Sequence, residues 1–146
     1  MKSLTRMILV VCCCNFLGIH NVSGMGFIEF TEMDGITYVY HIDKETLKKT
    51  PSWDGNIKNL PLSMEQAVNI GKKWAANKIK DKQDVLTLKE ISLTNICRTG
   101  IKNRWVYEIS FESKNKNSDY STTYMAVFFL DGTIIEPKKI KTNTKK

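Results

Sequence analysis

The segment that most constrains the fold is residues 124–130 (YMAVFFL), in which almost every side chain is apolar. A strand with one solvent-exposed face alternates apolar and polar residues. A strand that is covered on both faces, or that lies in the middle of a sheet, does not alternate in this way. Asp131-Gly132 follows directly. This pair indicates a two-residue hairpin loop, because glycine adopts positive φ freely and aspartate tolerates it. Residues 133–135 then return as a short last strand that stops at Pro137, and we assign Asp131 to the turn and not to catalysis.

A helix is predicted to begin after Ser63. The Ser63 hydroxyl can cap the first turn, and Gln66, three residues on, completes a capping box. Apolar residues then recur at spacings of three and four, with polar residues on the opposite side. The apolar stripe consists of Met64, Ala67, Val68, Gly71, Trp74, Ala75 and Ile79. Because Gly71 costs about 1 kcal/mol of helix propensity relative to alanine, we expect its backbone to pack closely against a flat surface.

Alternating segments supply that flat surface. Residues 91–94 and 105–112 read as two strands of a hairpin. In the second of these, Trp105, Tyr107, Ile109 and Phe111 share one face. Residues 36–42 also alternate and predict a further strand. We therefore predict an α+β fold in which one main helix packs on an antiparallel sheet of four or five strands.

The first 24 residues predict a secretory signal peptide. Lys2 and Arg6 precede an apolar run at residues 7–17, and small residues lead up to Gly24. The run is far shorter than the roughly 20 residues that cross a bilayer. We expect cleavage between Gly24 and Met25, a secreted or periplasmic protein and no stable membrane anchor. An N-terminal core helix is the alternative.

The cysteines allow one more interpretation of the leader. A cysteine triplet begins at Cys12, and lipidation there would resemble a bacterial lipoprotein, although Val11 fits poorly where a small residue is needed. After cleavage the chain keeps only Cys97, which excludes a disulfide within the chain. We interpret Cys97 as a small buried apolar residue, with pairing between chains as the alternative.

Length and charge predict one domain with a basic end. Removing 24 of the 146 residues leaves 122, which is enough for one core and too few for two. The formal charge of +7 falls to +5 without Lys2 and Arg6, and five lysines in residues 138–146 account for the remainder. We predict a single domain over residues 25–137 and a disordered basic tail, with weak contact to an anionic surface as the alternative. A nucleic-acid partner is not expected, since no basic face interleaved with aromatics is visible.

Three stretches resemble the PepSY-like group of small exported bacterial domains: LSMEQAVNIGKKWA, NRWVYEISFE and AVFFLDGTII. The resemblance covers residues 61–136 and implies half of a cystatin-type fold, with the helix lying across an antiparallel sheet. Some members of this group sit in the propeptides of thermolysin-like proteases and are proposed to restrain them. The resemblance thus implies restraint of a protease as one role, although no protease domain follows within these 146 residues.

Few residues suggest chemistry. His41 and Cys97 would be the only candidates for a nucleophilic dyad, which makes a small enzyme the least favoured alternative. His41, Asp43 and Glu45 have a spacing that could aim metal ligands from one strand face, but the stretch after Asp43 reads as a turn. We expect no catalytic activity, no cofactor and no metal.

Aromatic residues are better candidates for binding a protein or peptide. Trp53 lies in a predicted loop, where it is either an exposed anchor for a partner or a cover for the end of the sheet. Tyr38 and Tyr40 either extend one face of the sheet outward or fill the gap beneath this loop. We predict a binding domain with an exposed aromatic patch or a free sheet edge, with a structural component of the envelope as the alternative.

Overall fold

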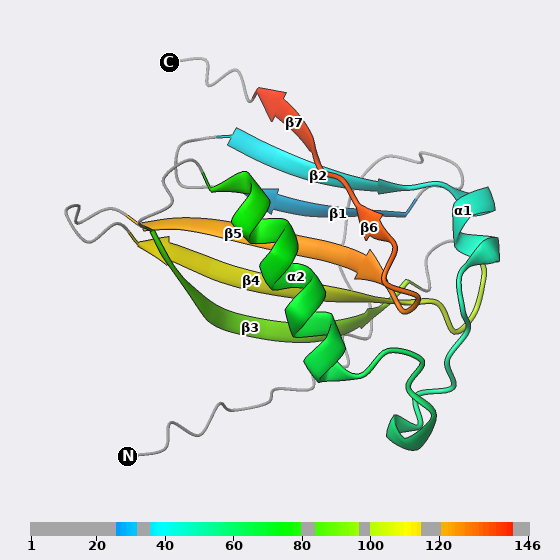
Figure 1. Ribbon diagram of the computed structural model, residues 1–146. Helices are drawn as coiled ribbons and strands as arrows, with labels where there is room; N and C mark the ends of the chain where they lie inside the picture. Colours follow the sequence, from blue (N-terminus) through cyan, green and yellow to red (C-terminus); the bar gives the residue numbers. More distant parts are fainter. Residues whose placement is uncertain (1–25, 32–35, 80–83, 97–99, 115–120, 142–146) are drawn as a thin grey trace.

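The computed structural model describes residues 26–31, 36–79, 84–96, 100–114 and 121–141. Its elements are β1 (Gly26–Thr31), β2 (Ile36–Ile42), α1 (Lys44–Lys49), the 3₁₀ helix η1 (Ile57–Asn59), α2 (Met64–Lys78), β3 (Val85–Asn95), β4 (Trp105–Lys114), β5 (Ser121–Phe129), β6 (Ile134–Ile135) and β7 (Lys138–Lys141). They form an α+β fold with two antiparallel sheets. The central sheet has the order β3-β4-β5-β6, and the second sheet has the order β1-β2-β7 (Figure 1).

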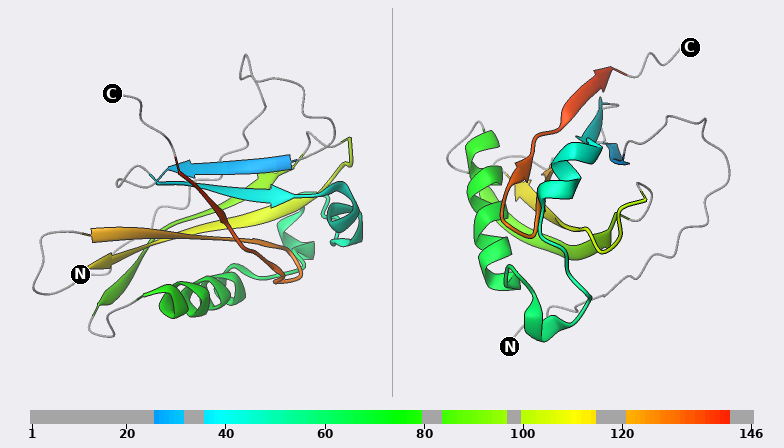
Figure 2. Two further views of the ribbon diagram at one scale, coloured as in Figure 1. Left: turned by 90° about the horizontal axis from the view of Figure 1, so that it is seen from above. Right: turned by 90° about the vertical axis from the view of Figure 1, so that its right-hand side faces the viewer.

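The described elements stack in three layers. Helix α2 covers one face of the central sheet, and the second sheet lies on the other side (Figure 2). Strand β5 alternates between the two cores that result. Ala126 and Phe128 point into the core beneath α2, whereas Val127 and Phe129 point into the core shared with the second sheet. All four side chains are at most 2% exposed, which confirms the prediction that this strand is covered on both faces.

Helix α2 begins as predicted. Ser63 Oγ accepts a hydrogen bond from Gln66 N at 3.2 Å, and Gln66 Oε1 accepts one from Ser63 N at 3.1 Å, which completes the capping box. The C-terminal end of α2 is hydrogen-bonded to Glu136, which directly follows β6. There Trp74 Nε1 donates to one carboxylate oxygen of Glu136 at 3.1 Å, and Lys78 Nζ contacts the other at 3.0 Å.

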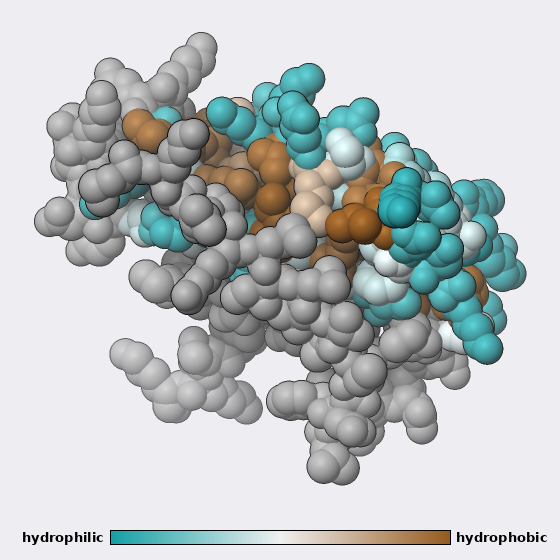
Figure 3. Space-filling model, turned by 90° about the horizontal axis from the view of Figure 1, so that it is seen from below, coloured by the Kyte–Doolittle hydropathy of each residue, from teal (hydrophilic) through white to brown (hydrophobic). Residues whose placement is uncertain are grey.

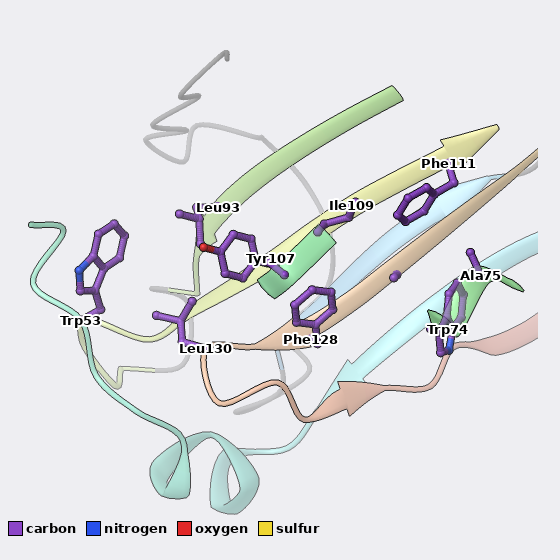
Figure 4. Packing of buried hydrophobic residues seen from close by; sticks show 11 residues of the cluster. Trp53, Trp74, Ala75, Leu93, Tyr107, Ile109, Phe111, Phe128 and Leu130 are labelled. Atoms are coloured by element: carbon purple, nitrogen blue, oxygen red, sulfur yellow. The ribbon is translucent and has the colours of Figure 1, made fainter. Parts of the chain in front are cut away.

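Gly71 explains how closely the helix approaches the sheet. A Cβ atom at this position would lie 3.1 Å from Phe111 Cε2 and 3.5 Å from Ile109 Cβ. Both of these β4 side chains are buried in the core beneath α2 (Figure 4). The predicted close packing of Gly71 against a flat surface is therefore confirmed, and the helix lies over β4 and β5.

The Asp131 turn is confirmed in role but not in length. Gly132 has φ +84°, its N–H donates to Phe129 O at 2.9 Å, and Phe129 N donates to Thr133 O at 3.0 Å. The loop therefore has three residues instead of two, with glycine in the left-handed position that such loops require. Asp131 Oδ1 accepts a hydrogen bond from Thr133 N at 2.9 Å, so this carboxylate stabilises the turn.

Two parts of the sequence interpretation need correction. The strand at residues 36–42 exists with the predicted bounds, but it belongs to a second sheet that was not predicted. The tail was predicted to be disordered from residue 138, yet Lys138–Lys141 forms β7 and pairs with β2. Backbone hydrogen bonding does not depend on side-chain polarity, and an edge strand tolerates lysines because their ends reach water. Residues 142–146 lie outside the described part of the chain.

Several other predictions also fall on residues that the structure does not describe. These are the signal peptide at residues 1–24, lipidation at Cys12 and the burial of Cys97. Within the described residues, none of the helices has the length and apolar character that crossing a bilayer demands.

We predict that Gly71→Val lowers the free energy of unfolding by about 2 kcal/mol, because the added methyl groups crowd the buried Phe111 ring. Urea denaturation monitored by circular dichroism measures this change. Ala76→Val, on the exposed side of the same helix, is the matched control and should cost about 0.6 kcal/mol at most. Equal effects of the two substitutions would contradict close packing at Gly71.

Candidate functional site

Trp53 is not an exposed anchor. Its side chain is 6% exposed and belongs to the core beneath α2. The Trp53 indole N–H donates to Asn56 O at 2.8 Å, and its ring meets Trp105 edge to face at 5.0 Å. Trp105 Nε1 in turn donates to Trp53 O at 3.0 Å. The prediction of Trp53 as an exposed anchor is therefore wrong, and the alternative, a side chain that folds back to cover the end of the sheet, is confirmed.

Tyr40 and Tyr38 differ from each other in exposure. Tyr40 is 1% exposed and its hydroxyl donates to Met125 O on β5, so it joins the second sheet to the central one. Burial, followed by the charge of Glu136, raises the pKa of Tyr40 well above its ordinary value. Tyr38 is half-buried, with Lys139 Nζ 5.3 Å from the centre of its ring. Neither tyrosine belongs to the core that holds Trp53, and the buried Tyr40 presents no binding surface.

Two of the three residues considered for metal binding, Asp43 and Glu45, have structural partners. Asp43 caps α1, since its carboxylate accepts hydrogen bonds from Thr46 N and Oγ1 at 2.7 and 2.6 Å. Glu45 forms an ion pair with Lys48 at 2.7 Å. Residues 44–49 are thus a short helix and not the predicted turn. His41 is exposed on β2, and Cys97 lies outside the described residues. In the described ranges, no group of three His, Cys, Asp or Glu side chains could hold a metal ion.

The feature that remains is the outer edge of β3. This strand has 11 residues and forms one edge of the central sheet, where β4 is its only neighbour in the part of the chain that the structure describes. An edge strand presents a row of backbone N–H and C=O groups to any segment that lies beside it. The β3 edge is therefore the best candidate for a binding site.

An apolar band lies beside this edge. Because α2 packs mainly on β4 and β5 and less on β3, several side chains of β3 stay partly open: Leu86, Leu88 and Ile91 are half-buried against the α2 core. Met64 and Val68 of α2 are half-buried as well. Figure 3 shows hydrophobic residues gathered in a band on the side where β3 forms the edge of the central sheet. We call these five residues the apolar band.

A bulge divides β3 in two. Leu88 lies opposite Phe111 and Glu90 lies opposite Ser110, so Lys89 is an extra residue on β3. Lys89 reaches Glu112 of β4 at 2.9 Å. Lys89 and Glu90 consequently lie on the same face, the one away from α2. Charged residues and bulges on edge strands limit unwanted pairing. Here both features are confined to Lys89 and Glu90, so the backbone groups on either side of the bulge can still pair with another strand.

The face of β3 and β4 away from α2 carries a half-buried carboxylate. Burial raises the pKa of Glu108, the charge of Glu90 adds to this, and a hydrogen bond with Thr94 acts in the opposite direction. Glu112 behaves differently, because the hydrogen bond from Lys89 lowers the pKa of its carboxyl group. The two glutamates of β4 are therefore expected to affect stability with opposite signs.

Sequence reasoning missed most of β3, although a signal was present. Only residues 91–94 were predicted as strand, whereas β3 begins at Val85. The apolar residues before the bulge, Leu86 and Leu88, stand at even positions, whereas those after it, Ile91 and Leu93, stand at odd positions. The slip of one residue at Lys89 is the signature of a bulge, because one extra residue moves every later side chain to the other face.

We predict that Glu108→Gln stabilises the protein at pH 7.5 and has little effect at pH 3.5. A carboxyl group whose pKa is raised in the folded state binds protons more tightly there, so stability falls as the pH rises from the ordinary pKa through the folded one. Glutamine removes this loss. Urea midpoints at both pH values provide the measurement, with Glu112→Gln as the control that should destabilise at pH 7.5. A lower midpoint for Glu108→Gln than for the wild type at pH 7.5 would refute the prediction.

Comparison with protein-family models, curated proteins and solved structures finds no match for this chain. The likeness to PepSY-like domains stays a prediction from the sequence, and the candidate site rests on its own geometry.

Proposed function

We propose that the protein is an exported, non-catalytic binding domain that takes up an extended polypeptide segment along the outer edge of β3. The observation that carries this proposal is the combination of an 11-residue edge strand with half-buried apolar side chains beside it. Strand addition uses backbone hydrogen bonds for affinity and pockets for every second side chain for specificity. The β3 edge supplies the backbone hydrogen-bonding groups, and the apolar band supplies the pockets for side chains.

The other features of the site agree with binding by an edge. Two of the three candidate aromatic side chains are buried: Tyr40 joins the two sheets, and Trp53 closes the end of the central sheet. Asp43, Glu45 and Asp131 are engaged in a cap, an ion pair and a turn. Restraint of a protease stays a narrower version of the same proposal, and inhibition of a panel of secreted proteases tests it.

We expect the purified protein to bind immobilised peptides of alternating apolar and polar residues, and to bind poorly to the same peptides with a central proline. Proline removes a backbone donor that strand addition needs. Binding of fluorescently labelled protein to a peptide array, at nanomolar protein concentration, gives the measurement.

Leu88→Lys and Ile91→Lys should weaken this binding by about tenfold or more, since each places a charge in the apolar band. Thr87→Lys, on the exposed opposite face of β3, is the matched control and should bind nearly as the wild type does. Circular dichroism verifies that all three variants fold. Equal binding of the proline-containing peptides, or unchanged binding by the folded Leu88→Lys and Ile91→Lys variants, would overturn the proposed site.

A further inference from the structure

We propose that one strand that adds to the β3 edge is β3 of a second copy of the protein, paired antiparallel about a two-fold axis that passes between Lys89 and Glu90. This inference rests on the proposed use of the β3 edge for strand addition. It names the partner of that site and its register, and it makes the protein a symmetric dimer with a continuous central sheet.

The sequence of β3 is self-complementary in this register. Read outward from the centre of VLTLKEISLT, the register pairs Lys89 with Glu90, then apolar with apolar and hydroxyl with hydroxyl side chains, until Val85 meets Thr94 at the end. Leu88 lies opposite the partner copy's Ile91, and Leu86 lies opposite its Leu93. On the other face, Thr87 meets Ser92. Cross-strand pairs of this kind are the unit of sheet stabilisation, and the two-fold axis makes each pair occur twice.

The bulge is what makes the register possible. A two-fold axis perpendicular to a sheet keeps each side chain on its own face, so the residues that meet across the axis must share a face. In a regular strand Lys89 and Glu90 would point to opposite faces. Because Lys89 is the extra residue, both lie on the face away from α2. Leu88 and Ile91 consequently share the face toward α2.

Charge fixes the register further. Each Lys89 lies opposite the partner copy's Glu90, which gives two pairs of opposite charge at the axis. A shift by one residue turns the apolar side chains toward the wrong face. A shift by two residues places either Lys89 opposite Leu88 or Glu90 opposite Ile91, which loses both pairs.

The ends of the strand point to the same register. Asp84 Oδ1 and Asn95 Oδ1 are buried and accept no hydrogen bond from the described residues. Asp84 directly precedes β3 and Asn95 ends it. In the proposed register these residues lie opposite each other, once at each end of the seam. The amide N–H of Asn95 can donate to Asp84 Oδ1 there, which gives this buried carboxylate oxygen a partner, whereas Asn95 Oδ1 is an acceptor and gains none from the contact.

The layer of helices leaves room for the second copy. Helix α2 packs mainly on β4 and β5 and less on β3, so the two helices of a dimer are separated, on average along their length, by about four inter-strand spacings, or roughly 19 Å. This exceeds the 10–12 Å diameter of a helix with its side chains. The gap between the helices is where the apolar bands of both copies meet. A seam of one strand per copy is small, so we expect a weak, concentration-dependent dimer.

Charge reversal tests the pairing directly. Sedimentation velocity over a micromolar-to-millimolar series should show a monomer–dimer equilibrium for the wild type. Lys89→Glu and Glu90→Lys should each weaken dimerisation by about tenfold or more, because both pairs at the axis become repulsive. The double reversal Lys89→Glu/Glu90→Lys should restore the dimer, and an equimolar mixture of the two single variants should form a heterodimer. Lys73→Glu, on the exposed face of α2, should change nothing.

The outcomes separate this inference from the proposed function. A wild type that stays monomeric while it still binds extended peptides would overturn the dimer and leave the proposed function standing. A dimer that is unaffected by Glu90→Lys uses another surface and would also overturn the inference. Glu90→Lys decides the question even if Lys89→Glu fails to fold, because it leaves the ion pair of Lys89 with Glu112 in place. Failure of both dimerisation and peptide binding would remove the β3 edge as a site altogether.

Discussion

The structure depends on the burial of β5 from both sides. Its alternating side chains enter two separate cores, one beneath α2 and one shared with the second sheet. A strand of this composition would leave a large apolar face in water if only one side were covered, and such a face is a liability in a soluble domain. The helix on one side, and β2 with Leu47 of α1 on the other, satisfy the same constraint. Tyr40 strengthens this arrangement by bonding to the backbone of β5.

The position of the candidate site follows from that constraint. Gly71 allows α2 to sit closely on β4, and the hydrogen bonds to Glu136 hold its other end toward β6 and β7. Because α2 covers β4 and β5 more fully than β3, the apolar face of β3 stays partly open, and no other described strand pairs with its outer edge. The same contacts that complete the core therefore create the surface that we propose for binding. The stability of the core and the proposed binding site are linked here by the placement of one helix.

Local signals in the sequence predicted much of the fold. The capping box at Ser63 and the turn at Asp131 depend on neighbours a few residues away, and both are confirmed, the turn with a loop one residue longer. The packing of Gly71 is confirmed as well, because its place in the apolar stripe indicated which side of the helix meets the sheet. The residues expected to bind a partner were predicted poorly. A tryptophan or tyrosine between polar neighbours looks alike in sequence whether it faces water or folds inward, because its burial is decided by distant segments. Trp53 contacts Trp105, and Tyr40 contacts Met125.

The sequence by itself determined that a helix begins after Ser63, that residues 36–42, 91–94, 105–112 and 124–130 form strands, and that the last of these is covered on both faces or lies in the middle of a sheet. These properties follow from hydrophobic periodicity and from short-range backbone hydrogen bonds. Only the tertiary structure decided that the early strand and the lysine-rich segment after Pro137 form a second sheet, and that α2 leaves β3 at an open edge. Strand partners and layer order are set by contacts between residues far apart in the chain, and the periodicity of one segment carries no information about which other segment will cover it.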